Sequence, residues 1–505
     1  MNKVIKIGER LSVEDVITVA NNKTVKVEVE NSAVSKVEKN RKIVEDILKG
    51  DKAVYGINTG FGSLSDIKID SNKLKQLQIN LIRSHSVGVG KFLSSEYVRA
   101  MMLLRAHNIS LGHSGVRMDV INSLLFFINN DIIPLIPKKG SVGASGDLAP
   151  LAHLVLCLIG EGSVLYKGEK RASLDVIKEL KGAVLELEAK EGLALINGTQ
   201  FMAAFGCIGL DRAEKLSKHA DIIAALSLEG VAGTFAPFDK RISDLRPHDG
   251  QKTVSANFIK LSKGSKISDS HKECQRVQDP YSFRCIPQVH GAVRDGISYL
   301  RKVVSTEINS VTDNPLVFDD AIISGGNFHG EPIALALDFA SIAVTELSSI
   351  SERRTDKLLT PAFNSGLPAY LAGGEAGLNS GLMIVQYTAA SLVNENRVLA
   401  HPSSVDNVPT SNNKEDHVSM GATGARKFMK IIKNTESVLA IELLTAVEAC
   451  SRRAPLLSSK PLNKVVDMVR AVVKPVSEDR VFSGDINSII ELIRSGKILE
   501  EVIVD

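Results

Sequence analysis

The sequence predicts a mainly α-helical protein, with a long central antiparallel helix bundle and a small mixed α/β region at the N-terminus. Three observations predict this fold class. Apolar residues recur at intervals of three and four between Val289 and Val311, which is the spacing of one helix face. Two further long helical stretches run from Glu331 to about Leu359 and from Gly381 to about Arg397, and long helices of this kind pack as bundles. Short β-branched runs alternate with helical patterns in roughly the first sixty residues.

The N-terminal region begins with two predicted strands. Val4–Ile7 and Thr24–Val29 are rich in β-branched residues, and a helix that starts at Ser12, with Glu14 in its first turn, separates them. This mixed layer leads into Tyr55. Far along the chain, Asp313-Asn314-Pro315 ends the helix that passes through Val311, because the residue before a proline avoids the helical conformation.

The chain divides by pattern into three consecutive segments. We expect a mixed α/β and helical segment with the active-site loops at 1–200, the long-helix bundle at 201–400, and a C-terminal helical region at 401–505. A length of 505 residues with 44% hydrophobic content is enough for a sizeable core.

Composition excludes some classes of partner. A net charge of +3 gives no reason to expect nucleic acid or an anionic membrane surface. No uninterrupted apolar stretch is long enough to span a bilayer, since the best candidate, around Leu148 to Ile159, is short and contains Pro150 and His153. The N-terminus has no apolar core of signal length. Five scattered cysteines argue against a disulfide framework and favour a reducing cytoplasm; they are Cys157, Cys207, Cys274, Cys285 and Cys450.

The most informative motif is the tract Gly-Ser-Val-Gly-Ala-Ser-Gly-Asp-Leu-Ala-Pro from Gly140 to Pro150. If the amide nitrogen of Gly146 attacks the carbonyl carbon of Ala144, a five-membered ring closes. Loss of two waters, one from the Ser145 side chain, then leaves an exocyclic methylidene. Glycine suits the attacking position because it has no Cβ and tolerates a compressed turn. The tract therefore predicts an electrophile made from the backbone, with Asp147 placed to handle protons during the dehydrations.

Other interpretations of this region fit less well. Glycine-rich stretches are usually flexible turns. The hydrolase motif Gly-x-Ser-x-Gly would need glycine where Asp147 and Lys139 stand, which leaves a serine hydrolase using Ser145 and His153 as the weakest alternative. Gly90-Lys91 lacks the hydroxyl residue of a phosphate loop. The sequence has no His-Glu-x-x-His pair and no cysteine pair at metal spacing, so we expect no metal.

Five motifs in combination resemble the aromatic amino acid ammonia-lyases, and most closely the branch that acts on histidine. They are the tract above, Tyr55 to Gly62 (Tyr-Gly-Ile-Asn-Thr-Gly-Phe-Gly), Asn197-Gly198-Thr199, the run Val277 to Arg284, and Gly325-Gly326-Asn327-Phe328-His329. The resemblance covers the chain from about the first strand to near residue 500. It implies a methylidene-imidazolone cofactor formed autocatalytically from Ala144, Ser145 and Gly146, in place of pyridoxal phosphate.

The resemblance implies a role for each catalytic residue. Tyr55 is the expected base for the β-proton, and it needs an electropositive pocket because a free phenol is a poor base at neutral pH. Arg284 is expected to hold the substrate carboxylate in a bidentate fork. Asn197 and Gln278 would add hydrogen bonds to the carboxylate and to the oxygen of the electrophile. Tyr281 and Phe328 would shape the surroundings of the ring.

Two residues bear on which substrate is expected. His85 lies where the family contacts the aromatic group, and it can hydrogen-bond an imidazole or a phenol. Glu415 occupies a position that tends to be glutamine in the phenylalanine and tyrosine enzymes and glutamate in the histidine enzymes. A carboxylate can pair with an imidazolium or accept its N–H, whereas beside a phenyl ring it would be unpaired. Lys414 stands where glutamine is more usual, which is a mild departure from the family pattern.

The expected activity is the elimination of ammonia from L-histidine to give trans-urocanate, the first step of histidine degradation. The resemblance also implies a homotetramer whose active sites draw segments from three subunits. Three alternatives stay open: an ammonia-lyase acting on tyrosine, an aromatic amino acid aminomutase, and a non-catalytic helical relative on the same scaffold. The order of amine and ring attack also stays open.

Overall fold

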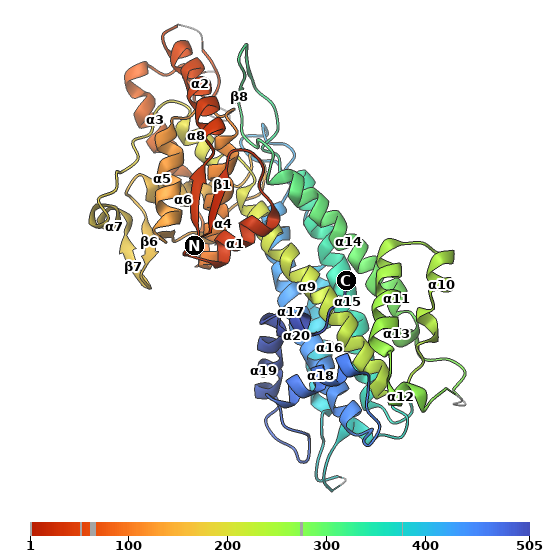
Figure 1. The fold of residues 1–505 in the computed structure, drawn as a ribbon. Helices are drawn as coiled ribbons and strands as arrows, with labels where there is room; N and C mark the ends of the chain where they lie inside the picture. Colours follow the sequence, from red (N-terminus) through yellow and green to blue (C-terminus); the bar gives the residue numbers. More distant parts are fainter. Residues whose placement is uncertain (1–2, 51–52, 61–66, 273–275, 376) are drawn as a thin grey trace. The chain divides into compact units, whose positions relative to one another are not determined.

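The computed structural model describes residues 3–50, 53–60, 67–272, 276–375 and 377–505. Contacts within the chain group it into two compact units. Unit 1 consists of residues 1–208, 300–338 and 402–426, and unit 2 of residues 209–299, 339–401 and 427–505. The prediction of a mainly α-helical chain with a small mixed α/β N-terminal region is confirmed (Figure 1). The division into 1–200, 201–400 and 401–505 stays a prediction.

Unit 1 combines helices with short strands (Figure 1). Its helical elements are α1 (Val13–Asn21), α2 (Asn31–Leu48), η2 (Ser71–Lys73), α3 (Leu74–His85), α4 (Ser95–Ser110), α5 (Met118–Asn129), α6 (Leu148–Leu158), α7 (Ser173–Glu179) and α8 (Glu191–Ile196). Its strands are β1 (Val4–Ile7), β2 (Lys26–Val29), β3 (Val89–Phe92), β4 (Ile133–Pro134), β5 (Pro137–Lys139), β6 (Ser163–Tyr166), β7 (Glu169–Ala172), β8 (Leu316–Val317) and β9 (Ile322–Ile323).

The strands of unit 1 form small separate sheets. β1 and β2 pair in parallel with Ile5 opposite Val27, β4, β6 and β7 form an antiparallel sheet, and β3–β5 and β8–β9 are antiparallel pairs. The helix predicted at Ser12 is α1, and its start is a capping box in which the Ser12 hydroxyl accepts from the Asp15 amide. The strand predicted from Thr24 begins two residues later, at Lys26.

Helix α4 is the buried centre of unit 1. Every residue from Tyr97 to Ser110 is buried, and the helix packs against α1 and α5. A helix buried on all sides must satisfy its polar side chains internally. Two of those side chains are the arginines Arg99 and Arg105, 2% and 0% exposed.

Unit 2 is helical. It holds the greater parts of four long helices, α9 (Gln200–Gly230), α14 (Ile286–Glu307), α15 (Glu331–Leu359) and α17 (Gly421–Ser451). Its other helical elements are η3 (Ala236–Phe238), α10 (Lys240–Leu245), α11 (Asp249–Ser262), α12 (Lys266–Asp269), α13 (Tyr281–Arg284), η4 (Ala369–Leu371), α16 (Met383–Leu399), α18 (Lys460–Arg470), α19 (Ser483–Arg494) and α20 (Lys497–Glu501).

The long helices agree closely with the sequence pattern. The helix predicted over Glu331 to Leu359 is α15, and the stretch predicted over Gly381 to Arg397 is α16. Helix α14 ends at Glu307, before the predicted Val311. Asn309 explains the early end, because its side-chain amide pairs with both backbone groups of Leu11 at 2.8 and 2.9 Å. The two 31-residue helices α9 and α17 were not predicted.

One described helix, α15, is long and apolar enough to cross a bilayer by length and composition alone. In its most apolar stretch, however, 67% of the residues are buried within the protein. A core helix passes the same test, so this finding is weak evidence for a membrane span.

A buried network of charges lies inside unit 2. Arg354 donates to both oxygens of Glu442 at 2.5 and 2.9 Å, and both side chains are fully buried. Arg354 also contacts the Nε2 of His290, whose Nδ1 lies 2.8 Å from Asp221. Arg294 completes the network with a 2.7 Å bond to Asp221. A buried pair contributes little against an apolar substitute, but removal of one partner leaves an unpaired buried charge.

We therefore expect Arg354→Met to lower the free energy of unfolding by about 3–5 kcal/mol, because Glu442 loses its cation. Lys240→Met breaks the exposed pair with Asp244 and should cost less than about 1 kcal/mol. Urea unfolding at a fixed protein concentration measures both changes. Equal effects of the two substitutions would contradict the assignment of Arg354 as the key partner.

Candidate active site

The tract predicted to form the electrophile is a tight loop that leads into α6. Gly146 has φ +77° and pairs with Gly198 as an isolated parallel bridge, and a Cβ at Gly146 would lie 2.2 Å from the Gly198 carbonyl oxygen. Gly143 has φ +68°, and a Cβ there would lie 2.2 Å from the Ser419 hydroxyl. Only glycine fits both positions. The loop therefore has the compressed, glycine-dependent backbone that ring closure requires.

Asp147 is fully buried directly after the tripeptide. Its amide donates to the Gly198 carbonyl at 2.7 Å, and its carboxylate accepts from the Ser141 hydroxyl at 2.9 Å and the Met202 amide at 3.0 Å. Burial raises the pKa of Asp147 to about 7, although these hydrogen bonds act in the opposite direction. A carboxyl group with this pKa can both give and take a proton near neutral pH.

Asn197 faces the same tripeptide from the end of α8. Its Nδ2 donates to the Ser145 carbonyl oxygen at 3.0 Å, which is the oxygen that the imidazolone would carry. Its Oδ1 is buried and has no hydrogen-bond partner among the described residues. A buried amide oxygen without a donor is free to accept from a water or a ligand. The predicted electrophile and Asn197 are thus brought together, and they fit the expected cofactor.

Glu415 also reaches the tripeptide. The Ser145 hydroxyl donates to Glu415 Oε1 at 2.7 Å, and the Thr410 hydroxyl donates to Oε2 at 2.7 Å. Thr410 and Glu415 form an antiparallel bridge around a turn, in which Ser411, Asn412 and Asn413 all have positive φ. The turn fixes the carboxylate beside the Ser145 side chain.

His85 is the last residue of α3 and is half-buried. Its Nδ1 lies 2.9 Å from the Leu81 carbonyl oxygen, which can only accept, so Nδ1 carries the proton and Nε2 is an acceptor. Burial lowers the pKa of His85, while the Leu81 carbonyl and the charge of Glu415 raise it. His85 is therefore within electrostatic reach of Glu415.

Tyr55 lies in a turn that packs against α8. Gly56 has φ +74°, and a Cβ there would lie 2.7 Å from Pro315 and 2.9 Å from Leu193 of α8, the helix that ends at Asn197. Tyr55 itself is half-buried. The last residues of this motif, Phe61 and Gly62, lie outside the described residues.

The segment that carries Phe328 borders the electrophile loop as well. The Gly330 amide donates to the Gly143 carbonyl at 3.4 Å, and the same carbonyl accepts from the Ser419 hydroxyl at 3.0 Å. Phe328 is half-buried. Segments distant in sequence thus converge on one loop of unit 1.

Three predicted site residues belong to unit 2. Gln278 and Tyr281 are exposed, Tyr281 to 71%, and Val277 beside them is 95% exposed. Arg284 lies over the Tyr281 ring, 4.8 Å from its centroid, and contacts the Asp279 carbonyl oxygen at 3.4 Å. These residues form a separate group on α13 and the segment before it.

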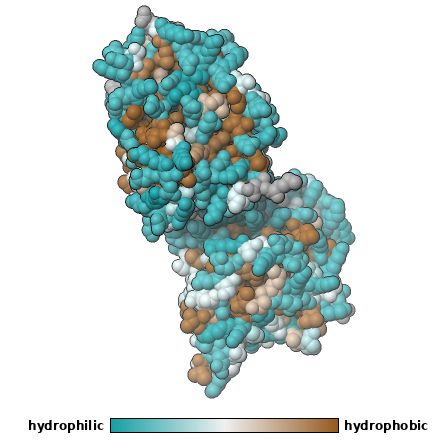
Figure 2. Space-filling view, turned by 60° about the vertical axis from the view of Figure 1, so that its left-hand side comes forward, coloured by the Kyte–Doolittle hydropathy of each residue, from teal (hydrophilic) through white to brown (hydrophobic). Residues whose placement is uncertain are grey.

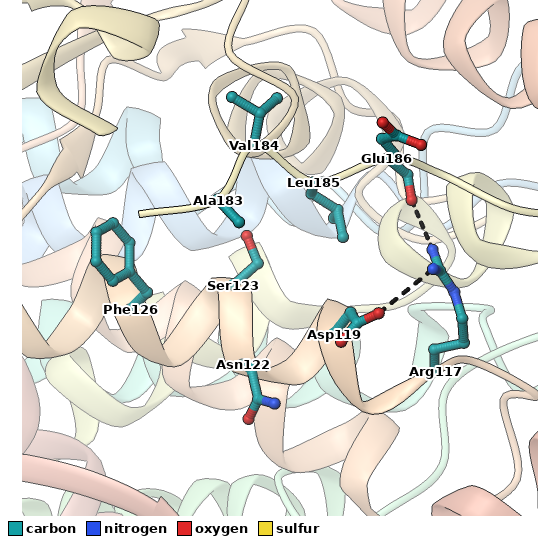
Figure 3. Close-up of a pocket in the computed structure, with 9 residues that line it drawn as sticks. All are labelled: Arg117, Asp119, Asn122, Ser123, Phe126, Ala183, Val184, Leu185 and Glu186. Carbon is teal, nitrogen blue, oxygen red and sulfur yellow. Dashed lines mark hydrogen bonds and ion pairs between the residues drawn. The ribbon is translucent and has the colours of Figure 1, made fainter. Parts of the chain in front are cut away.

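A pocket of about 520 Å³ beside α5 contains none of the predicted site residues (Figure 3). Its one arginine, Arg117, donates to the Glu186 carbonyl at 2.6 Å and contacts Asp119 at 3.3 Å (Figure 3) and Glu191 at 2.8 Å. The charges that line it already have partners, since Arg117 pairs with Asp119 and Glu191, and Glu186 pairs with Lys75. Among the described residues, no group of three or more His, Cys, Asp or Glu side chains is placed to hold a metal ion.

The sequence interpretation missed three residues of this site. Thr410 was detectable, since the turn residues Ser411 to Asn413 between it and Glu415 suggest a hairpin. Ser419 and Arg105 gave no signal, because a serine in a loop and an arginine in an apolar helix have no distinctive spacing. Arg105 donates to the Asn197 carbonyl at 2.8 Å.

Comparison with known proteins agrees with this arrangement. The aromatic amino acid lyase family model matches residues 11–471. A histidine ammonia-lyase of Caldanaerobacter subterraneus subsp. tengcongensis is 49% identical over 505 residues, which is 100% of this chain and 98% of that relative. The crystal structure of histidine ammonia-lyase from Trypanosoma cruzi superposes with a TM-score of 0.91 at 41% identity, covering 99% of this chain and 95% of the other. Tyrosine aminomutase from Streptomyces globisporus gives 0.93 at 37% identity, with 99% and 98% covered.

The raised pKa of Asp147 has a measurable effect on stability. Because its folded pKa lies above its unfolded value of 3.8, the folded chain binds more protons between these values, so its contribution to stability falls as pH rises through this range. In a Ser145→Ala background, where no ring can close, the chain with native Asp147 should lose about 2 kcal/mol of unfolding free energy relative to Asp147→Asn between pH 5 and 7. Urea unfolding at several pH values measures the difference. A difference that does not change with pH would exclude a raised pKa.

Proposed function

The chain belongs to the aromatic amino acid lyase family, and on that premise we propose that it eliminates ammonia from L-histidine to give trans-urocanate. The relatives named histidine ammonia-lyase, at 49% and 52% identity, support this substrate. The observation that carries the proposal is the position of Glu415. Its carboxylate lies 2.7 Å from the side chain that becomes the methylidene. It can pair there with an imidazole N–H of the substrate.

The electrophile is the first requirement of the reaction. Ala144, Ser145 and Gly146 hold the ring, which when formed supplies an electrophilic carbon and draws electron density to the Ser145 carbonyl oxygen. Asn197 Nδ2 donates to that oxygen at 3.0 Å. Asp147, buried and with a pKa of about 7, is placed to move protons while the two waters leave. Neither pyridoxal phosphate nor a metal ion has a role in this scheme.

The remaining steps fall to side chains that bind the substrate and move its protons. Tyr55 removes the β-proton of histidine, and the amine leaves as ammonia, which accounts for all atoms of the substrate. His85 Nε2 and Glu415 contact the imidazole. Arg284 and Gln278 hold the carboxylate, and Tyr281 and Phe328 enclose the ring.

Completion of the site by neighbouring subunits accounts for the exposed group on α13. In the single chain Tyr281 and Gln278 are exposed and Arg284 is half-buried, which suits residues that enter a site on another subunit. Unit 2 also exposes large apolar side chains on its long helices: Tyr299, Phe339, Ile342, Ile384 and Tyr387. Figure 2 shows apolar patches among the hydrophilic surface of the face it draws. Apolar patches of this kind favour self-association, here a homotetramer with sites shared among three subunits.

The cytoplasm is the proposed location. The four described cysteines are free, and Cys157, Cys207 and Cys450 are buried. Cys274 lies outside the described residues. Free buried thiols suit a reducing compartment.

A second candidate is an ammonia-lyase or aminomutase acting on tyrosine. His85 favours it, since Nε2 can accept the hydrogen bond of a phenol as readily as that of an imidazole. The match to tyrosine aminomutase supports the same fold with that chemistry. Glu415 weighs against it, because its carboxylate would be buried beside a ring without an N–H partner.

Purified protein supplied separately with L-histidine, L-tyrosine and L-phenylalanine tests the proposal. We expect urocanate from histidine alone, followed by its near-ultraviolet absorbance, and no product from the Ser145→Ala control. Coumarate from tyrosine would shift the assignment to the second candidate. No product from any of the three would favour a non-catalytic scaffold.

Subunit sharing predicts complementation between inactive variants. Tyr55→Phe and Arg284→Met should each be inactive, yet their co-expression should recover about one quarter of native activity, since random assortment leaves that share of sites with both native residues. Tyr55→Phe paired with Ser145→Ala is the matched control. Both of those residues lie in unit 1, so no recovery is expected. Hybrid oligomers without activity in the first pair would refute shared sites.

A further inference from the structure

The arginine behind Asn197 has no part in the chemistry described so far. Arg105 is fully buried in α4, and its Nη1 donates to the Asn197 carbonyl at 2.8 Å and to Gln200 Oε1 at 2.9 Å. Its Nη2 donates to the side-chain oxygen of Asn108. A Cβ at Gly198 would lie 2.6 Å from Arg105 Nη1, so the guanidinium packs directly against the backbone that pairs with Gly146.

The partners of Arg105 are unusual for a buried cation because all three are neutral. Buried charges in proteins are normally paired with an opposite charge. Asp313 is the carboxylate whose charge acts on Arg105, but its Oδ2 accepts from the buried Lys190 at 2.9 Å and its Oδ1 from the Asn314 amide at 2.7 Å. Burial lowers the pKa of Arg105 only to about 10, so the guanidinium stays protonated at neutral pH.

Arg99, in the same helix, is a buried arginine that does have a carboxylate partner. It is equally buried and also donates to backbone carbonyls, those of Val19 and Ile128, but it has a carboxylate partner in Asp131 at 2.9 Å. Arg99 is thus hydrogen-bonded to a carboxylate. Arg105 has no hydrogen-bonded carboxylate, and it binds the backbone of Asn197, the residue whose side chain donates to the Ser145 carbonyl oxygen.

We propose that Arg105 is a positioning residue for the electrophile: it holds the Asn197 backbone and keeps a positive charge, without a hydrogen-bonded carboxylate, next to the residue that binds the Ser145 carbonyl oxygen. That oxygen gains negative charge when a nucleophile adds to the methylidene carbon. A fixed positive charge in a water-excluded site stabilises such a change without reorganisation. The inference rests on the proposed function, since it requires the ring to form.

The test measures the reactivity of the ring without its substrate. The probe is borohydride, and the loss of the near-ultraviolet absorbance of the ring gives the rate of addition. Intact mass, lower by two waters, shows separately whether the ring has formed. We expect Arg105→Gln to form the ring but to add borohydride at least about tenfold more slowly, with kcat for histidine reduced in proportion and KM little changed. Arg105→Lys, which keeps the charge, should recover most of the rate.

Gln200→Glu tests the charge while Arg105 stays in place. It puts a carboxylate at the oxygen that already accepts from Arg105, so the hydrogen bond survives and the charge is neutralised. Addition should again slow by at least about threefold. This variant decides the question if Arg105→Gln does not fold or does not close its ring. Arg99→Gln is the control that removes a buried arginine of the same helix, and its ring should react at the native rate.

The outcomes separate this inference from the proposed function. If the native chain has neither the mass loss nor the absorbance, the proposed function fails. If the native ring forms and Gln200→Glu reacts at the native rate, the role of Arg105 is overturned while the function stands. A similar slowing in Arg99→Gln would also overturn it, because general destabilisation would then explain the effect.

Discussion

The close approach of two backbone segments, at Gly146 and Gly198, is the constraint on which the site depends. The Asp147 amide donates to the Gly198 carbonyl at 2.7 Å, and neither glycine has room for a side chain. This contact brings the end of α8 against the tripeptide, so that Asn197 meets the Ser145 carbonyl. It also packs Arg105 behind both segments. A methyl group at either glycine would separate the two segments and with them the contact between Asn197 and the Ser145 carbonyl.

Much of the fold was predictable because its long helices have regular patterns. The apolar positions Val293, Ile297, Leu300 and Val304 are buried, as the spacing of a helix face predicts. The end of α14 was not predictable, since it depends on Asn309 meeting Leu11 almost three hundred positions away. Periodicity records which face of a helix is buried, but it carries no information on contacts between distant segments.

The residues of the candidate site likewise divide into those that sequence patterns predict and those that depend on contacts in the folded chain. The residue types of the motif around Ser145 predict the electrophile. The family resemblance predicts further site residues, such as Glu415. Thr410, Ser419 and Arg105 act on those residues through hydrogen bonds that exist only in the folded chain. Their roles are set by geometry, so no pattern in the sequence identifies them. The same holds for Asp147, whose acidity is controlled by its complete burial.

The hydrogen bond between Ser145 and Glu415 can exist only before the electrophile forms. The hydroxyl that donates to Glu415 Oε1 is the group that dehydration removes on the proposed chemistry, while the Thr410 hydroxyl stays on Oε2. Before dehydration each oxygen of this carboxylate therefore accepts from a side-chain hydroxyl, and after dehydration Oε1 has lost its donor and can accept from the imidazole of the substrate. Since the lost water does not return, maturation is a one-way event. On the proposed function, the residue that would select the substrate thus gains a free acceptor in the same event that completes the electrophile.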